Sequence, residues 1–186
     1  EGGGVALSGD GSKIIIGCQY GEDPVQTNYT NEGAAIVLQI NGDNNFSKMG
    51  ETLYDRYVGE SNNNGSDHFG FSVAMSKDGT TVAVASQYDD YNTEGVYSSD
   101  CGSFRVYKWN GISWVQKGQK ITGYTSGTQC HAVQLSEDGN IVAGSFPYAD
   151  QNGSDTGYIH VLMYNSTTER WDTMGVLARF HPVFKK

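Results

Sequence analysis

A pattern that occurs three times limits what this chain can fold into more strongly than any other feature of its sequence. Each copy has a serine, an Asp-Gly pair two and three residues later, a tyrosine twelve residues after the serine, and an aromatic residue 35 or 38 residues after it. The landmarks are Ser8, Asp10, Tyr20 and Phe46 in the first copy, Ser76, Asp78, Tyr88 and Trp114 in the second, and Ser136, Asp138, Tyr148 and Trp171 in the third. Spacing kept over three copies indicates a repeat protein in which each copy is one structural unit.

The composition favours short strands over helices. The chain has 186 residues, of which 37% are hydrophobic and 12% aromatic, and this is enough for a packed core. It contains 25 glycines and only 3 prolines, which suits many strands joined by tight turns. We therefore expect an all-β protein.

The charge and the hydropathy exclude some partners. A net charge of -9 argues against nucleic acid, because a phosphate backbone is bound by a basic surface. No apolar run approaches the roughly 18 to 20 residues that a membrane-spanning helix needs, and no signal-peptide pattern is present. Since the chain begins at Glu1 rather than at a methionine, we expect a processed product or part of a longer protein.

Each copy is predicted to form four antiparallel strands. A short first strand ends at Asp-Gly, whose residues accept the positive φ angles of a tight hairpin. The second strand is an unbroken apolar run, which is typical of a strand covered on both faces. A polar excursion then leads to a third strand rich in Val, Ile, Phe and Tyr, and an outer strand carries the aromatic landmark. The expected ranges are 4–7, 72–75 and 132–135 for the first strand, 13–18, 81–86 and 141–145 for the second, and 34–40, 103–109 and 158–164 for the third.

Four-stranded antiparallel sheets that repeat every 60 to 68 residues are the building blocks of a β-propeller. We expect three blades, each closed by a glycine, followed by a short tail or linker. The expected ranges are 1–66, 67–126 and 127–175 for the blades, closed by Gly50, Gly118 and Gly175, and 176–186 for the tail. Because propellers typically have four to eight blades, three leave two apolar faces bare, and further blades or partner chains should complete the structure.

The second copy resembles a known repeat. The stretch from Phe69 to Ser76, FGFSVAMS, followed by Asp78-Gly79 and the apolar run from Val82 to Ala85, is similar to the FG-GAP repeat of integrin-alpha-type propellers. Its Ser-x-Asp-Gly turn is also shared with WD40-type blades. The resemblance implies a propeller and a role in adhesion.

The FG-GAP resemblance also implies Ca²⁺ in a loop between the first two strands of a blade. Here those strands are joined by Asp-Gly alone, so an ion would have to be bound in the later excursion. The oxygen-bearing candidates are Asp89, Asp90, Asn92 and Glu94 in the second copy, and Asp150, Asn152 and Asp155 in the third. The alternative is that these residues form solvated acidic loops without a metal.

Three further groups of residues each have two interpretations. Tyr20, Tyr88 and Tyr148 either stack on a sugar ring or pack between neighbouring sheets. Cys101 and Cys130 fall at the same end of the predicted sheets, so they form either a disulfide or, with Cys18, a set of free thiols. Five N-glycosylation sequons favour the secretory route, although loops rich in Asn and Ser also raise such counts. Their acceptor residues are Asn28, Asn45, Asn64, Asn152 and Asn165.

No motif of a known catalytic type is present. The sequence contains no GxSxG, HExxH or phosphate-binding loop, and its four histidines are not spaced as a metal pair. We expect a non-catalytic extracellular or cell-surface module for adhesion or structural assembly that needs no cofactor, with Ca²⁺ as an optional ligand. The alternatives are a lectin-like propeller that binds glycans and, more remotely, a glycosidase-type propeller with paired carboxylates facing each other across the axis.

Overall fold

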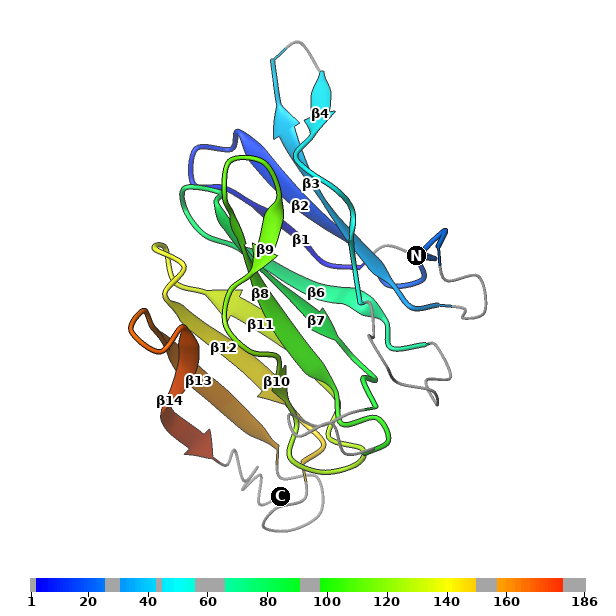
Figure 1. Ribbon diagram of the computed structural model, residues 1–186. Coiled ribbons are helices and arrows are strands. Elements are labelled where there is room, and N and C mark those ends of the chain that lie inside the picture. The colour runs from blue at the N-terminus through cyan, green and yellow to red at the C-terminus, as the bar shows by residue number, and fades with distance from the viewer. Residues whose placement is uncertain are drawn as a thin grey trace, which may run out of the picture.

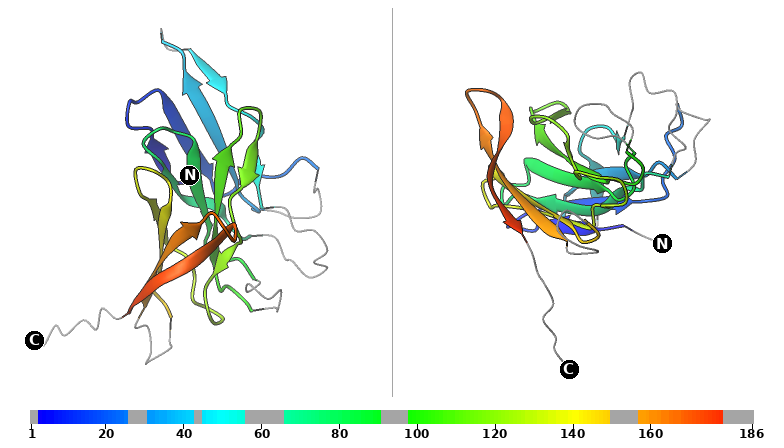
Figure 2. Two further views of the ribbon diagram at one scale, coloured as in Figure 1. Left: turned by 60° about the vertical axis from the view of Figure 1, so that its left-hand side comes forward. Right: turned by 90° about the horizontal axis from the view of Figure 1, so that it is seen from below.

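The structure, a computed structural model, describes residues 3–25, 31–42, 45–55, 66–90, 98–149 and 157–178. Within these ranges the protein is all-β, with three antiparallel sheets and no helix (Figure 1). The sheets follow one another in chain order, with the first and third on opposite sides of the second (Figures 1 and 2). The expected all-β fold is confirmed, and the arrangement is that of a propeller segment.

Each sheet corresponds to one sequence repeat, and we call the three sheets units 1, 2 and 3. Unit 1 contains β1 (Val5–Leu7), β2 (Lys13–Cys18), β3 (Ala34–Ile40), β4 (Phe46–Lys48) and β5 (Leu53–Tyr54). Unit 2 contains β6 (Phe69–Met75), β7 (Thr81–Ser86), β8 (Ser103–Trp109), β9 (Trp114–Gln116) and β10 (Ile121–Thr122). Unit 3 contains β11 (Ala132–Leu135), β12 (Ile141–Phe146), β13 (Tyr158–Asn165) and β14 (Arg170–Ala178). In every unit the first four strands pair in chain order.

The glycine that was expected to close each unit instead lies inside its outer edge. In unit 1, β3 pairs with β4 before Gly50 and with β5 after it, and in unit 2, β8 pairs with β9 and β10 on the two sides of Gly118. In unit 3 a single strand passes through Gly175 with an irregular register and stays paired with β13 as far as Ala178. Residues 176–178, which were expected in a tail, therefore belong to unit 3.

The Ser-x-Asp-Gly turns are alike in all three units, but they are not the two-residue hairpins that were expected. Five residues separate the first and second strands, and only the glycine has a positive φ, at 70°, 65° and 67° in units 1, 2 and 3. The aspartate acts through its side chain. Asp138 Oδ1 accepts hydrogen bonds from the Ser136 hydroxyl (2.6 Å) and the Asn140 backbone N–H (3.0 Å). These bonds, led by the one from Ser136, lower the pKa of Asp138 to about 2.

The three turns are also bonded to one another. The backbone N–H of Gly9 donates to the carbonyl of Lys77 (2.8 Å), and the N–H of Lys77 donates to the carbonyl of Glu137 (2.8 Å). These bonds join neighbouring units beside their first strands, so the turns form a continuous backbone-bonded series.

Two apolar clusters fill the spaces between units. The cluster between units 1 and 2 contains Ile15, Ala35, Val37, Leu53, Phe69, Val73, Val82, Val84, Tyr107 and Trp114. The cluster between units 2 and 3 contains Ala74, Ala83, Ala85, Phe104, Val106, Ile121, Cys130, Val133, Val142, Phe146, Ala149, Tyr158, Leu162 and Trp171. Unit 2 contributes to both, with Val82 and Val84 facing unit 1 and Ala83 and Ala85 facing unit 3.

Candidate binding surfaces

At the end of the sheets where the second strands stop, the tyrosine landmarks and two histidines form what we call the tyrosine–histidine row. It consists of Tyr20, His68, Tyr88, His131 and Tyr148. His68 lies edge-on between Tyr20 and Tyr88, with ring centroids 5.0 Å from each, and His131 lies edge-on to Tyr148 at 5.1 Å. Gln87 connects the two halves, because its Nε2 lies 3.3 Å from His131 Nε2 and its side chain also hydrogen-bonds His68. The row therefore runs across all three units.

The row bears on the two interpretations of the tyrosines. Each of the three tyrosines packs part of its ring against a histidine, either within its own unit or across to the neighbouring unit. Tyr20 and Tyr148 nevertheless remain 45% exposed. Burial lowers the pKa of both histidines, so their rings are neutral near pH 7.

Of the calcium candidates, Asp89 and Asp90 lie within the described residues. Asp89 is fully buried and forms an ion pair with Lys120 Nζ (3.2 Å), while its Oδ2 accepts a hydrogen bond from Ser103 (2.5 Å). Asp90 Oδ1 accepts the backbone N–H of Asp100 (2.9 Å), and burial raises its pKa. These contacts bind both carboxylates into the fold, so the pair does not fit a calcium site, and no group of three or more His, Cys, Asp or Glu side chains in the described ranges could hold a metal.

The remaining calcium candidates lie outside the described residues: Asn92, Glu94, Asp150, Asn152 and Asp155. The same holds for the acceptor residues Asn28, Asn64 and Asn152 of three sequons. Asn45 is exposed just before β4, and Asn165 ends β13 with its side-chain amide donating to Asp172 (2.8 Å).

Cys18, Cys101 and Cys130 are free thiols in the structure, so the disulfide considered between Cys101 and Cys130 is not formed. Cys101 Sγ instead donates to the carbonyl of Asp89 (3.2 Å). Burial raises the pKa of Cys101 to about 12 and raises that of Cys130 as well. Both thiols are therefore protonated and unreactive near neutral pH.

A second ion pair crosses the boundary between units 1 and 2. Arg105 Nη1 on β8 lies 2.5 Å from Asp55 Oδ2, which also accepts a hydrogen bond from Ser86 (2.8 Å). The side chains of Arg105 and Asp55 are 11% and 1% exposed. The pair fixes the segment after β5 against the middle of unit 2.

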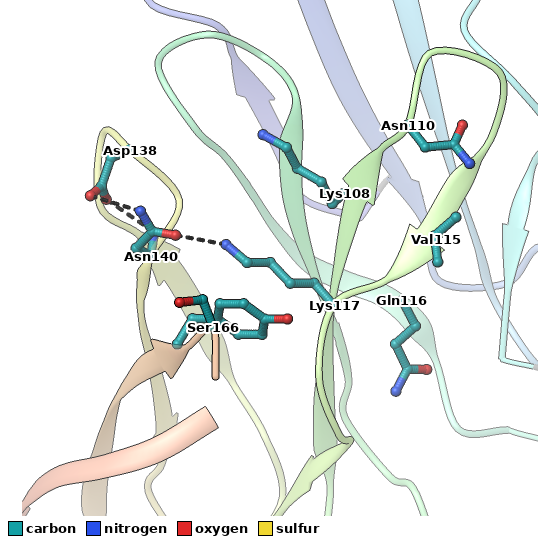
Figure 3. Close-up of a pocket in the computed structure, with 9 residues that line it drawn as sticks. Lys108, Asn110, Val115, Gln116, Lys117, Asp138, Asn140 and Ser166 are labelled. Carbon is teal, nitrogen blue, oxygen red and sulfur yellow. Dashed lines mark hydrogen bonds between the residues drawn. The ribbon is translucent and has the colours of Figure 1, made fainter. Parts of the chain in front are cut away.

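At the opposite end of the sheets, a cleft of about 660 Å³ separates the outer parts of units 2 and 3 (Figure 3). It is lined by Lys108, Asn110, Val115, Gln116, Lys117, Asp138, Asn140, Tyr164 and Ser166. Lys117 Nζ donates to the Gly139 carbonyl (2.7 Å) and to Asn140 Oδ1 (2.9 Å), and it lies 4.5 Å from the centroid of the Tyr164 ring. These contacts already satisfy the Lys117 ammonium group. We therefore interpret the cleft mainly as a contact between units 2 and 3, and only secondarily as a ligand site.

A smaller cavity, of about 230 Å³, lies between β10 and the outer strands of unit 3. His160 borders it and is only 6% exposed. Its Nε2 is 2.9 Å from the Thr173 hydroxyl, whereas its Nδ1 has no hydrogen-bond partner among the described residues. Burial lowers the pKa of His160, so the ring is neutral near pH 7.

Units 1 and 3 each have a face that points away from unit 2. The face of unit 1 that points away from unit 2 carries Val5, Leu7, Ile14, Ile16, Ile36 and Leu38, which are directly opposite one another across β1, β2 and β3. Val5 and Leu7 are 64% and 57% exposed. The face of unit 3 that points away from unit 2 carries Gln134, Ala143, Ser145, Ile159, Val161 and Met163.

Sequence reasoning missed several of these features. They are the Asp55–Arg105 pair and the contacts of His160 and Lys117, each of which involves residues far apart in the chain. One signal was available for Asp89: the tyrosine landmark is followed by Gly21 in the first copy and Ala149 in the third, so the aspartate is specific to the middle unit. A residue present in one copy alone points to a local pairing rather than to a repeated ligand site.

Comparison with known proteins supports the fold and no more. No family model and no curated protein matches the sequence. Among solved structures, the chain is similar to a protein of Bacteroides uniformis provisionally assigned as a 6-phosphogluconolactonase, with a TM-score of 0.58 and 13% identity over 96% of this chain and 41% of that one. It is also similar to the hydrazine synthase of Kuenenia stuttgartiensis, with a TM-score of 0.53 and 14% identity over 96% of this chain and 37% of that one. Both have propeller-type folds, and the chain spans about two-fifths of their length.

Proposed function

We propose that this chain is a non-catalytic propeller segment that serves adhesion or structural assembly outside the cell or at its surface, with other protein chains or further blades as partners. The observation that carries the proposal is that units 1 and 3 each have a face, directed away from unit 2, on which aliphatic side chains are half-buried or exposed among the described residues. Such aligned aliphatic residues on a soluble protein mark an interaction surface. Rigid units with two ends of that kind are suited to assembly.

The ionisable groups support a non-catalytic role. Asp89, Asp55 and Arg105 are in buried pairs, and the thiols of Cys101 and Cys130 are protonated. These groups stabilise the fold, and none is offered to a substrate. The proposed function needs no cofactor, and Ca²⁺ is not required for it.

Association in solution tests the proposal. Light scattering coupled to size exclusion should give a mass above that of a single chain, and a hydrophobic dye such as ANS should bind at dilutions where the chains separate. A monomer that unfolds cooperatively and binds no dye would argue against assembly through these faces.

The extracellular location rests on the five sequons. Expression through a eukaryotic secretory pathway should give a product whose electrophoretic mobility increases after enzymatic removal of N-glycans. Replacing Asn45 by Gln, at an exposed sequon, should remove one step of that shift. A secreted product without glycans would contradict this part of the proposal.

A second candidate function, glycan binding, is favoured by one observation: Tyr20 and Tyr148 are nearly half exposed at the ends of the tyrosine–histidine row. A glycan array tests it, with Tyr148→Ala expected to abolish any binding. Tyr124→Ala is the matched control, since Tyr124 is also 45% exposed but lies outside the row. Binding that is unaffected by Tyr148→Ala would exclude the row as the site.

A further inference from the structure

The two joints between units use the same contact, which we call the aromatic–glycine latch. At the first joint, the indole N–H of Trp114 in unit 2 donates to the carbonyl of Met49 in unit 1 (2.8 Å). At the second joint, the indole N–H of Trp171 in unit 3 donates to the carbonyl of Lys117 in unit 2 (2.5 Å). A glycine follows each carbonyl: a side chain at Gly118 would collide with Trp171, and one at Gly50 would collide with Trp109 and meet Trp114 closely.

Both outer units carry half of a further latch. Phe46 in unit 1 pairs with Ile40 in the register in which Trp114 pairs with Trp109 and Trp171 with Tyr164. It is 58% exposed, whereas Trp114 and Trp171 are 5% and 3% exposed. Unit 1 therefore has the aromatic residue of a latch without a glycine to cover.

Unit 3 has the other half. Gly175 follows Trp171 by four residues, as Gly50 follows Phe46 and Gly118 follows Trp114. Met174, which corresponds to Met49 and Lys117, is 55% exposed. Its carbonyl and the glycine after it form the receiving side of a latch, and no aromatic contact to them is seen among the described residues.

The second strands of neighbouring units pack against each other at both internal joints. At the first joint, unit 1 presents Ile15 and Ala35 to Val82 and Val84 of unit 2, and Gly17 lies against Gly70. At the second, unit 2 presents Ala83 and Ala85 toward unit 3. The later unit offers Val142 and Gly144 there, and the Phe104 ring of unit 2 covers Gly144.

The residues of the second strand on the two free faces differ in size. Unit 3 presents Ala143 and Ser145 at the positions of Ala83 and Ala85, as their pairing with β13 shows. Unit 1 presents Ile14 and Ile16 at the positions of Val82 and Val84. The free face of unit 3 is therefore small where the free face of unit 1 is large.

We propose that the free face of unit 3 binds unit 1 of a second copy of this chain, with Phe46 of that copy covering Gly175. The inference rests on the proposed function and specifies its partner. Two such contacts join two copies head to tail, and the resulting six units fall within the four to eight of closed propellers. A phenyl ring has no N–H group, so this latch lacks the hydrogen bond present in the other two.

Complementary variants test the head-to-tail arrangement. Leu7→Glu places a charge on the free face of unit 1, and Met174→Glu places one on the receiving side in unit 3. Each variant alone should be monomeric by analytical ultracentrifugation, and an equimolar mixture should recover dimers, because the mixture retains one intact pair of faces. Ile112→Glu is the control, since Ile112 is 84% exposed away from both faces and its change should leave the dimer intact.

A gain of affinity provides a second test. Phe46→Trp restores the missing indole N–H in both latches of the dimer and should lower the dimer dissociation constant about 25-fold, because each latch gains one hydrogen bond worth about five-fold. Circular dichroism and thermal unfolding at low concentration verify that each variant is folded.

The outcomes separate the two proposals. A monomeric wild-type chain overturns the head-to-tail contact and leaves further blades as the partners that cover these faces. Association that survives both Leu7→Glu and Met174→Glu, or that the mixture fails to restore, overturns the head-to-tail contact while leaving assembly through another surface in place.

Discussion

The second strands of units 1, 2 and 3 have similar sequences but different surroundings. All six residues of β7 in unit 2 are buried, whereas β2 in unit 1 and β12 in unit 3 alternate between buried and half-buried positions. The apolar run of β2 would suit burial on both faces equally well. The comparison shows that a two-sided apolar strand becomes fully buried only when it has a neighbouring unit on each side.

The largest expected effect is the difference in lost stability between a substitution on an internal face and one on a free face. Phe104 is fully buried with its ring against Gly144, and Ile159 holds the corresponding position on the free face of unit 3. Phe104→Ala should lower the free energy of unfolding by about 3–5 kcal/mol, because it leaves a cavity. Ile159→Ala should cost less than about 1.5 kcal/mol. Urea denaturation of dilute protein measures both, and equal losses would show that the free face is packed after all.

Breaking the buried ion pair should have the next largest effect. Arg105→Leu leaves Asp55 buried beside an apolar side chain and should destabilise the protein by about 3 kcal/mol. The control is Lys77→Ala, which removes the ion pair with Glu137, whose two side chains are 63% and 78% exposed. That change should cost no more than about 1 kcal/mol. If chemical denaturation gives similar values for the two variants, the Asp55–Arg105 pair is not buried as described.

A substitution within a latch should be more costly than one in an open turn. Gly118 and Gly111 both have positive φ, at 76° and 102°, but a side chain at Gly118 meets Trp171 whereas one at Gly111 meets nothing within 4 Å. Gly111→Ala should cost about 1–2 kcal/mol from the backbone conformation alone. Gly118→Ala should cost at least about 1 kcal/mol more, because Trp171 must move. Thermal unfolding with tryptophan fluorescence detects both the loss and the displaced indole.

The smallest effect concerns acidification. Burial lowers the pKa of His68, His131 and His160, so the unfolded chain binds protons that the folded chain does not at pH values below the ordinary histidine pKa. Stability should therefore be constant above about pH 7 and should fall as the pH drops through about 6.5 towards the lowered values. His160→Gln should reduce this slope, and His68→Gln, at a half-buried ring, should reduce it less. A melting temperature that rises on acidification from pH 7 to pH 5 would contradict this sign.

Much of the fold could be predicted because the strong signals are local. The second strands of units 1 and 2 and the third strands of the same units have the bounds that the apolar runs indicate. The two-residue strands β5 and β10 were not predicted. They lie after Gly50 and Gly118, where the units were expected to end, and they form only by pairing with β3 and β8. The turn type was wrong because Asp-Gly also suits a five-residue turn in which the aspartate side chain, rather than its backbone, makes the bonds.

The candidate sites were less predictable for a physical reason. An acidic residue in a polar excursion looks the same in sequence whether it faces water, an ion or a lysine. Asp89 is paired with Lys120, which is 31 residues away and belongs to the outer edge of the same sheet. The packing of the tyrosines was also hard to predict, because the histidine partners of Tyr20 and Tyr148 come from another repeat or another segment of the same repeat. Only the fold brings these groups together.

The backbone bonds that run from Gly9 to Lys77 and from Lys77 to Glu137 have a geometric consequence when combined with the indole contacts at the outer strands. Each pair of neighbouring sheets is joined at two points, one close to the axis around which the sheets are arranged and one far from that axis. Two such anchor points oppose any opening or closing of the wedge between sheets. Each joint therefore sets the angle between its two sheets. That angle in turn determines how many units complete a closed ring.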